Sequence, residues 1–190
     1  MQTLTDTPPR EQDRPGFLES ERITTLALPE DGCLPAIAKS IEAAMGTGKA
    51  AEVCRPCAEF LRHASRFYKV PACGIQVLAA RPLRVREHWV SELFGDYHGG
   101  TLLIRLWMRT AVRQEVTSFG TLLNTLCHEF CHHLDVYLFH FANTWHTRGF
   151  YERTAALYHH ARGTPRKPLF WLPMPDGRWR MDWQRIRRGA

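Results

Sequence analysis

The segment NTLCHEFCHHLD, residues 124–135, constrains the fold of this chain more than any other stretch. It contains the pattern H-E-x-x-H, with His128 and His132 four residues apart and Glu129 directly after the first histidine. On an α-helix, side chains four residues apart lie on one face, so both imidazoles can reach a single ion. Glu129 lies about 100° further round such a helix and would stand beside the ion without binding it. The chain must therefore bury this helix and bring a further ligand back to it.

The flanking residues predict a helix packed into a core. It runs from about Ser118 to Phe139, with Thr117 or Ser118 as its N-cap. Apolar residues occupy its other sides: Leu122, Leu123, Leu126, Phe130 and Leu134. A zinc ion on the two histidines would lower the pKa of a bound water, and Glu129 would accept the proton of that water.

A catalytic zinc ion needs a third protein ligand and an open fourth position. Two downstream residues are candidates, His146 and Glu152, which follow His132 by fourteen and twenty residues. Either spacing leaves room for the end of the helix, a loop and a return of the chain. His140 lies too far along the predicted helix axis. His133 points about 100° away from His132, so we expect it to be a surface or packing residue.

Four further side chains near the motif have less defined roles. Asp135 follows His132 by three residues and could orient a ligand imidazole through a hydrogen bond, with a cap or surface charge as the alternative. We expect Cys131 to be a small buried core residue rather than a thiolate ligand. Tyr151 and His140 are possible donors to a transition-state oxyanion, and the sequence favours neither.

The helix TLCHEFCHHLD is followed by His146 and then by an aromatic residue four positions on, Phe150. Together these elements resemble the SprT-like zinc metalloprotease family, which includes the Spartan DNA–protein crosslink proteases. The preceding GGTLLIRL also resembles the strand that leads into the active-site helix of that family. The resemblance spans roughly residues 50–160 and implies a compact α+β, zincin-like domain with a small sheet packed on helices. It also implies one catalytic Zn²⁺, Glu129 as catalytic base, and three metal ligands: His128, His132 and His146.

The sequence departs from the family in two places. The family often has H-G-x-x-[FW] in the second half of the site, whereas Thr147 stands here in place of the glycine. Many members carry a C-terminal zinc ribbon with two C-x-x-C pairs, but this chain has no cysteine after Cys131. If that ribbon contributes to substrate or DNA binding, another element must do so here.

The other predicted elements follow from hydrophobic periodicity and turn residues. A helical pattern from Pro35 to about Tyr68 is broken near Gly46–Gly48, and residues 74–80 form a compact apolar strand. Residues 91–108 predict a hairpin around Gly99 and Gly100, with Leu102, Ile104, Leu106 and Met108 on one face. A last helix is expected from about Thr147 to His160, ending before Gly163.

Proline content and charge divide the chain into three parts. We expect a flexible N-terminal arm over residues 1–30, the SprT-like domain over residues 31–160, and a basic, Trp/Arg-rich tail over residues 161–190. Of the net charge of +6, the tail holds eight basic and two acidic residues, so the rest of the chain is neutral.

The tail interleaves tryptophans with arginines, a composition that suits single-stranded nucleic acid. Its candidate DNA-binding residues are Trp179, Arg178 and Arg180. The alternative is a β-hairpin that turns at Pro175-Asp176-Gly177 and packs its tryptophans on the domain.

The sequence therefore predicts a zinc metalloendopeptidase that hydrolyses protein or peptide substrates, with DNA-associated proteins among the candidates. The alternative is a non-catalytic nucleic-acid-associated binding protein with a structural or degenerate zinc site. No stretch of about 18 apolar residues predicts a membrane helix, and the polar, proline-rich start lacks the pattern of a secretory signal. We expect a cytoplasmic protein whose six cysteines are reduced.

Overall fold

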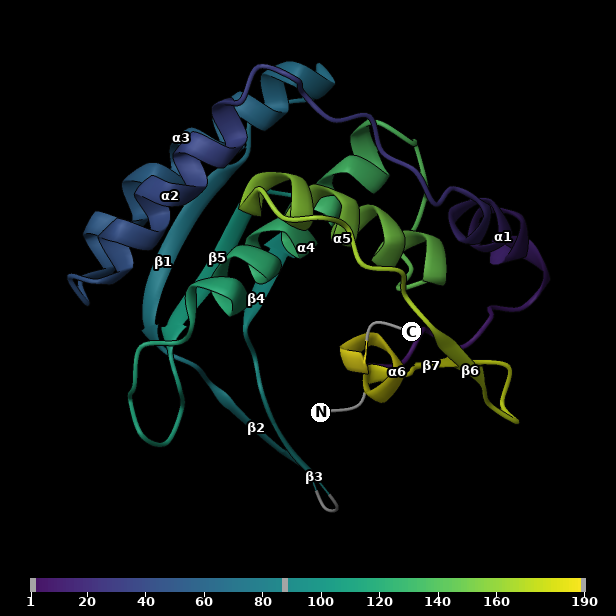
Figure 1. The fold of residues 1–190 in the computed structure, drawn as a ribbon. Coiled ribbons are helices and arrows are strands. Elements are labelled where there is room, and N and C mark those ends of the chain that lie inside the picture. Colours follow the sequence, from purple (N-terminus) through teal and green to yellow (C-terminus); the bar gives the residue numbers. More distant parts are fainter. Residues whose placement is uncertain (1–2, 87–88, 189–190) are drawn as a thin grey trace.

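A three-stranded sheet in the order β1-β5-β4 supports the helices of an α+β fold in the computed structural model, which describes residues 3–86 and 89–188 (Figure 1). The helices are η1 (Glu11–Asp13), α1 (Arg14–Arg22), α2 (Cys33–Met45), α3 (Ala50–Tyr68), α4 (Phe119–Tyr137), α5 (Arg148–Arg162) and α6 (Trp183–Arg188). The strands are β1 (Gly74–Ala80), β2 (Leu83–Arg86), β3 (Trp89–Glu92), β4 (Gly95–His98), β5 (Leu103–Arg109), β6 (Trp171–Pro173) and β7 (Trp179–Met181). From α2 onward, the predicted order of two helices, strands, a long helix, a further helix and a tail is confirmed, but η1 and α1 were not predicted.

The central strand β5 pairs with β1 in parallel and with β4 antiparallel. Its alternate residues Ile104, Leu106 and Met108 are fully buried, as the period of two in a strand predicts. Leu102 was expected on the same face, but its positive φ of 50° places it in the turn before the strand. The predicted hairpin around Gly99–Gly100 is confirmed. Strands β2 and β3 pair with each other outside this sheet.

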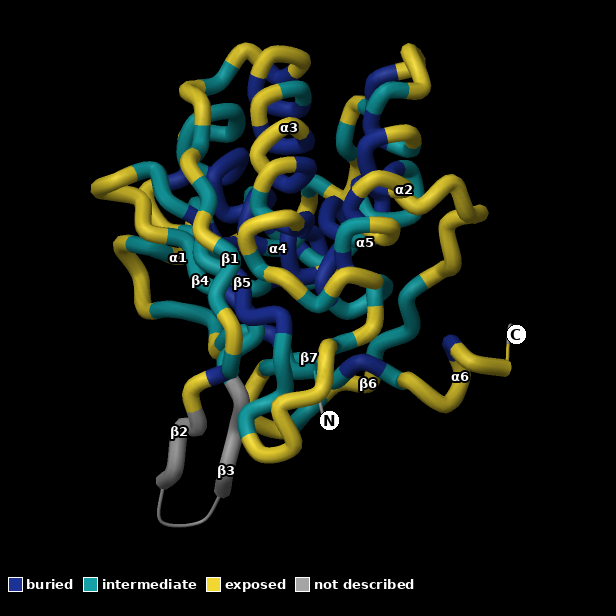
Figure 2. Tube along the Cα trace, turned by 90° about the vertical axis from the view of Figure 1, so that its left-hand side faces the viewer, coloured by how far each residue is buried: buried dark blue, intermediate teal, exposed yellow. Residues whose placement is uncertain are grey.

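A layer of helices covers the sheet. Helix α3 contacts β1, α4 contacts β4 and β5, and α2 and α5 pack on these two helices. The buried part of the chain lies where the helices and the sheet meet (Figure 2). Its largest members include Phe60, Leu61, Leu123, Leu126 and Phe130, all fully buried. The apolar sides of the H-E-x-x-H helix thus face a core, and its fourth side is free to carry chemistry.

The helix ends follow the predicted local signals. Ser118 caps α4, because its Oγ accepts the Thr121 backbone N–H at 3.2 Å. Between α2 and α3, Gly48 has a φ of 69° and breaks the helical pattern where the sequence indicates. Helix α5 begins after Thr147 and ends at Gly163, whose φ of 67° is the left-handed conformation that favours glycine after a helix.

Both terminal segments contact the domain. Residues 3–30 were expected as a flexible arm, but α1 packs against α5, and Phe17 and Ser20 are buried. The physical reason is Arg153 on α5, which donates to the carbonyl groups of Ser20 and Ile23 at the end of α1. At the other terminus β6 and β7 form an antiparallel pair, with Gly177 in the turn at a φ of 80°. This is the hairpin that the turn residues predict.

Among the described residues, no helix combines the length and the apolar character needed to cross a membrane.

Candidate metal centre

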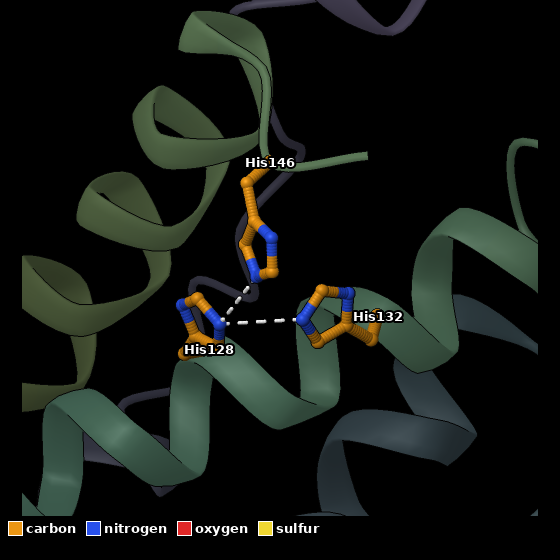
Figure 3. Close-up of side chains that lie close together, drawn as sticks. All are labelled: His128, His132 and His146. Carbon is orange, nitrogen blue, oxygen red and sulfur yellow. Dashed lines mark hydrogen bonds between the residues drawn. The ribbon is translucent and has the colours of Figure 1, made fainter. Parts of the chain in front are cut away.

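Three histidines from two parts of the chain meet at one point (Figure 3). His128 and His132 lie on one face of α4, and His146 enters from the loop just before α5. The Nε2 atom of His128 is 3.1 Å from Nε2 of His146 and 3.2 Å from Nε2 of His132. One ring nitrogen from each of the three histidines can be selected so that all three nitrogens lie within 4.8 Å of one another. The structure therefore brings together the three residues that the sequence analysis selected.

The arrangement fits a tetrahedral metal ion. Zinc–nitrogen bonds of 2.0–2.1 Å at the tetrahedral angle place two ligand nitrogens about 3.4 Å apart. The distances of 3.1 and 3.2 Å are close to that value. Three imidazoles also leave a fourth position for another ligand, which is typical of catalytic rather than structural zinc sites.

Burial favours the neutral form of His128 and His132, which is the form that binds metals. Burial and, to a smaller extent, the neighbouring His146 lower the pKa of His128 to about 3. Burial also lowers the pKa of His132 well below its ordinary value. Phe150 supports the cluster, because its ring stacks on His132 at 4.5 Å between centroids and meets His128 edge-on at 4.9 Å. The predicted aromatic residue after His146 is thus part of the site.

Glu129 lies next to the three histidines and lines the same pocket, which has a volume of about 700 Å³. Burial raises the pKa of Glu129 to about 8, with a smaller contribution from the charge of Asp96. The backbone of β4 lies against its side chain. A Cβ added at Gly95 would be only 3.1 Å from Glu129 Cγ and 2.6 Å from Thr125 Cγ2. The glycine therefore allows the strand to approach the glutamate.

Two acidic residues considered in the sequence analysis have other partners. Among the described residues, no hydrogen bond joins Asp135 to the imidazole of a candidate ligand. Its Oδ1 instead accepts from Arg153 Nη2 at 2.8 Å, and both side chains are buried. Glu152, the alternative third ligand, forms an ion pair with Arg166 and stays outside the histidine cluster.

The remaining side chains near the motif are structural. His133 is fully buried, as the packing alternative predicts, and both its ring nitrogens have partners. Its Nε2–H donates to the Pro71 carbonyl at 2.9 Å, so its Nδ1 accepts from the Tyr97 hydroxyl at 2.9 Å. Cys131 is buried, as expected for a core residue. Neither His140 nor Tyr151 is among the described residues that line the pocket.

Sequence reasoning gave no sign of Asp6, which lies at the site. Its carboxylate lines the pocket and accepts the backbone N–H of His146 at 2.8 Å. The two residues are 140 positions apart. No local pattern signals such a contact, because the residues near Asp6 are polar and proline-rich and predict no regular element.

Two of the candidate DNA-binding residues of the tail, Trp179 and Arg178, contact other side chains of the chain. The guanidinium of Arg148 lies 3.9 Å from the ring centroid of Trp179. Arg178 forms an ion pair with Asp176 at 2.6 Å. Arg180 lies in the middle of β7 and forms an isolated bridge with Leu4.

A second group of possible metal ligands, Asp31, Cys33 and His63, lies at the start of α2. The Asp31 carboxylate is half exposed. It accepts a hydrogen bond from the Cys33 backbone N–H at 3.0 Å and lies 2.9 Å from His63 Nε2. The histidine cluster is the better metal site, because it is more deeply buried.

Comparisons with protein-family models, curated proteins and solved structures found no match to this chain.

Proposed function

We propose that this chain is a zinc metallopeptidase of the SprT-like type, with a zincin-like domain and one catalytic ion held by His128, His132 and His146. The observation that carries the proposal is the convergence of three Nε2 atoms beside a buried glutamate at the wall of an open pocket. A structural zinc site needs neither the glutamate nor the pocket. Their presence together favours hydrolysis over a purely structural role.

The role of Glu129 follows from its place beside the cluster. When bound, zinc acts as a Lewis acid on a substrate carbonyl and makes water acidic enough to act as a nucleophile near neutral pH. Burial raises the pKa of Glu129, and a positive charge held beside it would lower that pKa and favour the carboxylate. Glu129 can then act as general base on the attacking water and as proton donor to the leaving amine. The imidazoles only bind and orient.

The substrate in this proposal is a protein or peptide, which reaches the site through the pocket beside β4. The resemblance to SprT-like proteases and the positive charge of residues 161–190 support DNA-associated proteins as a substrate class. A non-catalytic nucleic-acid-associated protein with a degenerate zinc site is the alternative function. It would retain the metal and lack cleavage.

The decisive experiment compares the wild type with Glu129→Gln. We expect both proteins to bind one zinc ion per chain, measured by elemental analysis. Hydrolysis of casein and of a protein–DNA crosslink should fall by about 10²- to 10⁴-fold in the variant, the usual contribution of a general base. Glu42→Gln, an exposed change of the same chemistry on α2, is the matched control and should keep full activity.

The outcomes separate the two functions. Full activity in Glu129→Gln would contradict the mechanism. Zinc binding by the wild type without cleavage of either substrate would favour the non-catalytic alternative. Loss of activity on chelation and its recovery with added zinc would support the proposed peptidase.

A further inference from the structure

The N-terminal segment is built into the wall of the histidine site. Residues 3–5 run along β7, where the Thr5 backbone N–H donates to the Trp179 carbonyl at 2.9 Å. The Met181 N–H donates to the Thr3 carbonyl at 2.9 Å, and the Trp179 N–H donates to Thr5 Oγ1 at 2.8 Å. The segment therefore pairs with β7 through an isolated antiparallel bridge between Leu4 and Arg180, immediately before Asp6.

A second anchor holds the other side of Asp6. The end of α1 lies on the first turn of α5, where Ser20 Oγ is 3.0 Å from Thr147 Oγ1. The Arg148 backbone N–H donates to a Glu21 carboxylate oxygen at 2.8 Å. The buried Arg153 donates to the Ser20 carbonyl at 3.0 Å. The chain is thus anchored both before and after Asp6, by the pairing of residues 3–5 with β7 and by the contacts of α1 with α5.

Asp6 makes three contacts with the third candidate ligand, His146. Its backbone N–H donates to the His146 carbonyl at 3.0 Å, and its Oδ2 accepts the His146 backbone N–H at 2.8 Å. The same Oδ2 lies 3.4 Å from Nδ1 of the His146 ring. An imidazole that binds a metal through Nε2 must carry its proton on Nδ1, and a carboxylate facing Nδ1 favours that tautomer.

We propose that Asp6 is a positioning residue that fixes the ring and the tautomer of His146 for metal binding. The inference rests on the proposed zinc site. It assigns to the third ligand, His146, a partner near the N-terminus, 140 positions earlier in the chain. Asp135, the expected partner of a ligand imidazole, is held by Arg153. The Nδ1 atom of His132 is buried and has no hydrogen-bond partner among the described residues. Of the two carboxylates considered, Asp135 and Asp6, the one that faces a candidate ligand imidazole is Asp6, which faces His146.

The test uses the full chain with Zn²⁺ alone and measures zinc affinity by competition with a chromophoric chelator. Asp6→Asn keeps the size of the side chain and an oxygen that can accept the His146 N–H, but removes the charge facing Nδ1. We expect its affinity to fall by about 10- to 100-fold, the usual effect of losing a hydrogen-bond partner of a ligand histidine. Glu11→Gln, an exposed carboxylate in the same segment, is the matched control and should bind zinc like the wild type.

A second readout separates positioning from general stability. With zinc removed by chelator, Asp6→Asn should unfold at the same temperature as the wild type, because the main-chain pairing of residues 3–6 remains. The Co²⁺-loaded variant should also show an altered visible spectrum, since the third ligand is less well oriented. Wild-type affinity in Asp6→Asn, or an affinity loss matched by an equal loss of metal-free stability, would overturn the inference. Absence of zinc binding by both the wild type and Glu11→Gln would instead show that the proposed function itself fails.

Discussion

Arg153 is a buried positive charge that links three parts of the fold, and its removal is the most informative test of the architecture. Its side chain is 1% exposed and that of Asp135 is 0% exposed. The guanidinium binds Asp135 on α4 at 2.8 Å, the Ser20 carbonyl at 3.0 Å and the Ile23 carbonyl at 2.5 Å. Arg153→Met replaces it with an apolar chain of similar length. Asp135 then remains buried without its partner, and both carbonyls lose their donor.

The expected loss is large for one side chain. Removing one partner of a buried ion pair costs about 3–5 kcal/mol, because the other charge remains buried without compensation. Domains have a total stability of about 5–15 kcal/mol, so the variant loses a substantial part of it. For a chain of this size the melting temperature should fall by about 6–20 °C. Urea denaturation followed by tryptophan fluorescence gives the free-energy difference directly.

The pH dependence identifies the cause of the loss. Burial raises the pKa of Asp135 to about 6, and Arg153 opposes that rise. Because the folded pKa exceeds the ordinary value of about 3.9, this group costs the wild type stability as the pH rises from about 4 to 6, and no more above 6. Without Arg153 the pKa of Asp135 rises further, so the variant continues to lose stability above pH 6. Measured with chelator present, the stability gap should widen between pH 6 and 8 by at most about 1.4 kcal/mol per pH unit.

Two results would refute this reasoning. One is a stability gap that stays constant between pH 6 and 8. The other concerns the double variant Arg153→Met/Asp135→Asn, which removes the buried charge and should recover about 1 kcal/mol or more relative to Arg153→Met. A double variant as unstable as the single one would show that the lost carbonyl contacts, and not the charge, set the cost.

Two glycine substitutions test close approaches at the site. Gly95→Ala places a Cβ 2.6 Å from Thr125 Cγ2 and 3.1 Å from Glu129 Cγ, so β4 or the glutamate must shift. Peptide cleavage should fall about 10-fold or more at unchanged zinc content, and normal kcat/KM would contradict the expectation. Gly149→Ala places a Cβ 2.0 Å from the Ser20 carbonyl oxygen, so the end of α1 must move away from α5. We expect a loss of about 1–3 kcal/mol and faster tryptic cleavage after Arg22, at the end of α1, and wild-type resistance to trypsin would show that α1 is not held there.

Local signals predicted most of the regular structure. The caps at Ser118 and Thr147 and the turn at Gly99–Gly100 act within a few residues, so the sequence carries them directly. The H-E-x-x-H spacing selected His128 and His132 for the same reason. His146 needed more, namely the resemblance to a family pattern, because its spacing alone also admitted Glu152.

Contacts between distant segments could not be predicted in this way. Helical periodicity placed Asp135 near the ligand histidines but carried no information about Arg153, which arrives from the next helix. Likewise, the polar start of the chain gave no sign that Asp6 meets His146 across 140 positions. The N-terminal segment resembled a flexible arm because its partners are main-chain and buried polar groups rather than an apolar stripe.

The departure at Thr147 from the glycine of the family pattern has a local explanation. Thr147 Oγ1 accepts the Phe150 N–H at 3.0 Å and so caps α5, while it also meets Ser20 Oγ at 3.0 Å. A glycine could make neither contact. The close backbone approach that requires a glycine lies two residues later, at Gly149, against the carbonyls at the end of α1. Thr147 has less backbone freedom than a glycine, but its side chain links the N-terminal segment to the residue directly after His146. Of the three candidate ligands, His146 is the one that is not held within a helix, so its geometry depends most on this link.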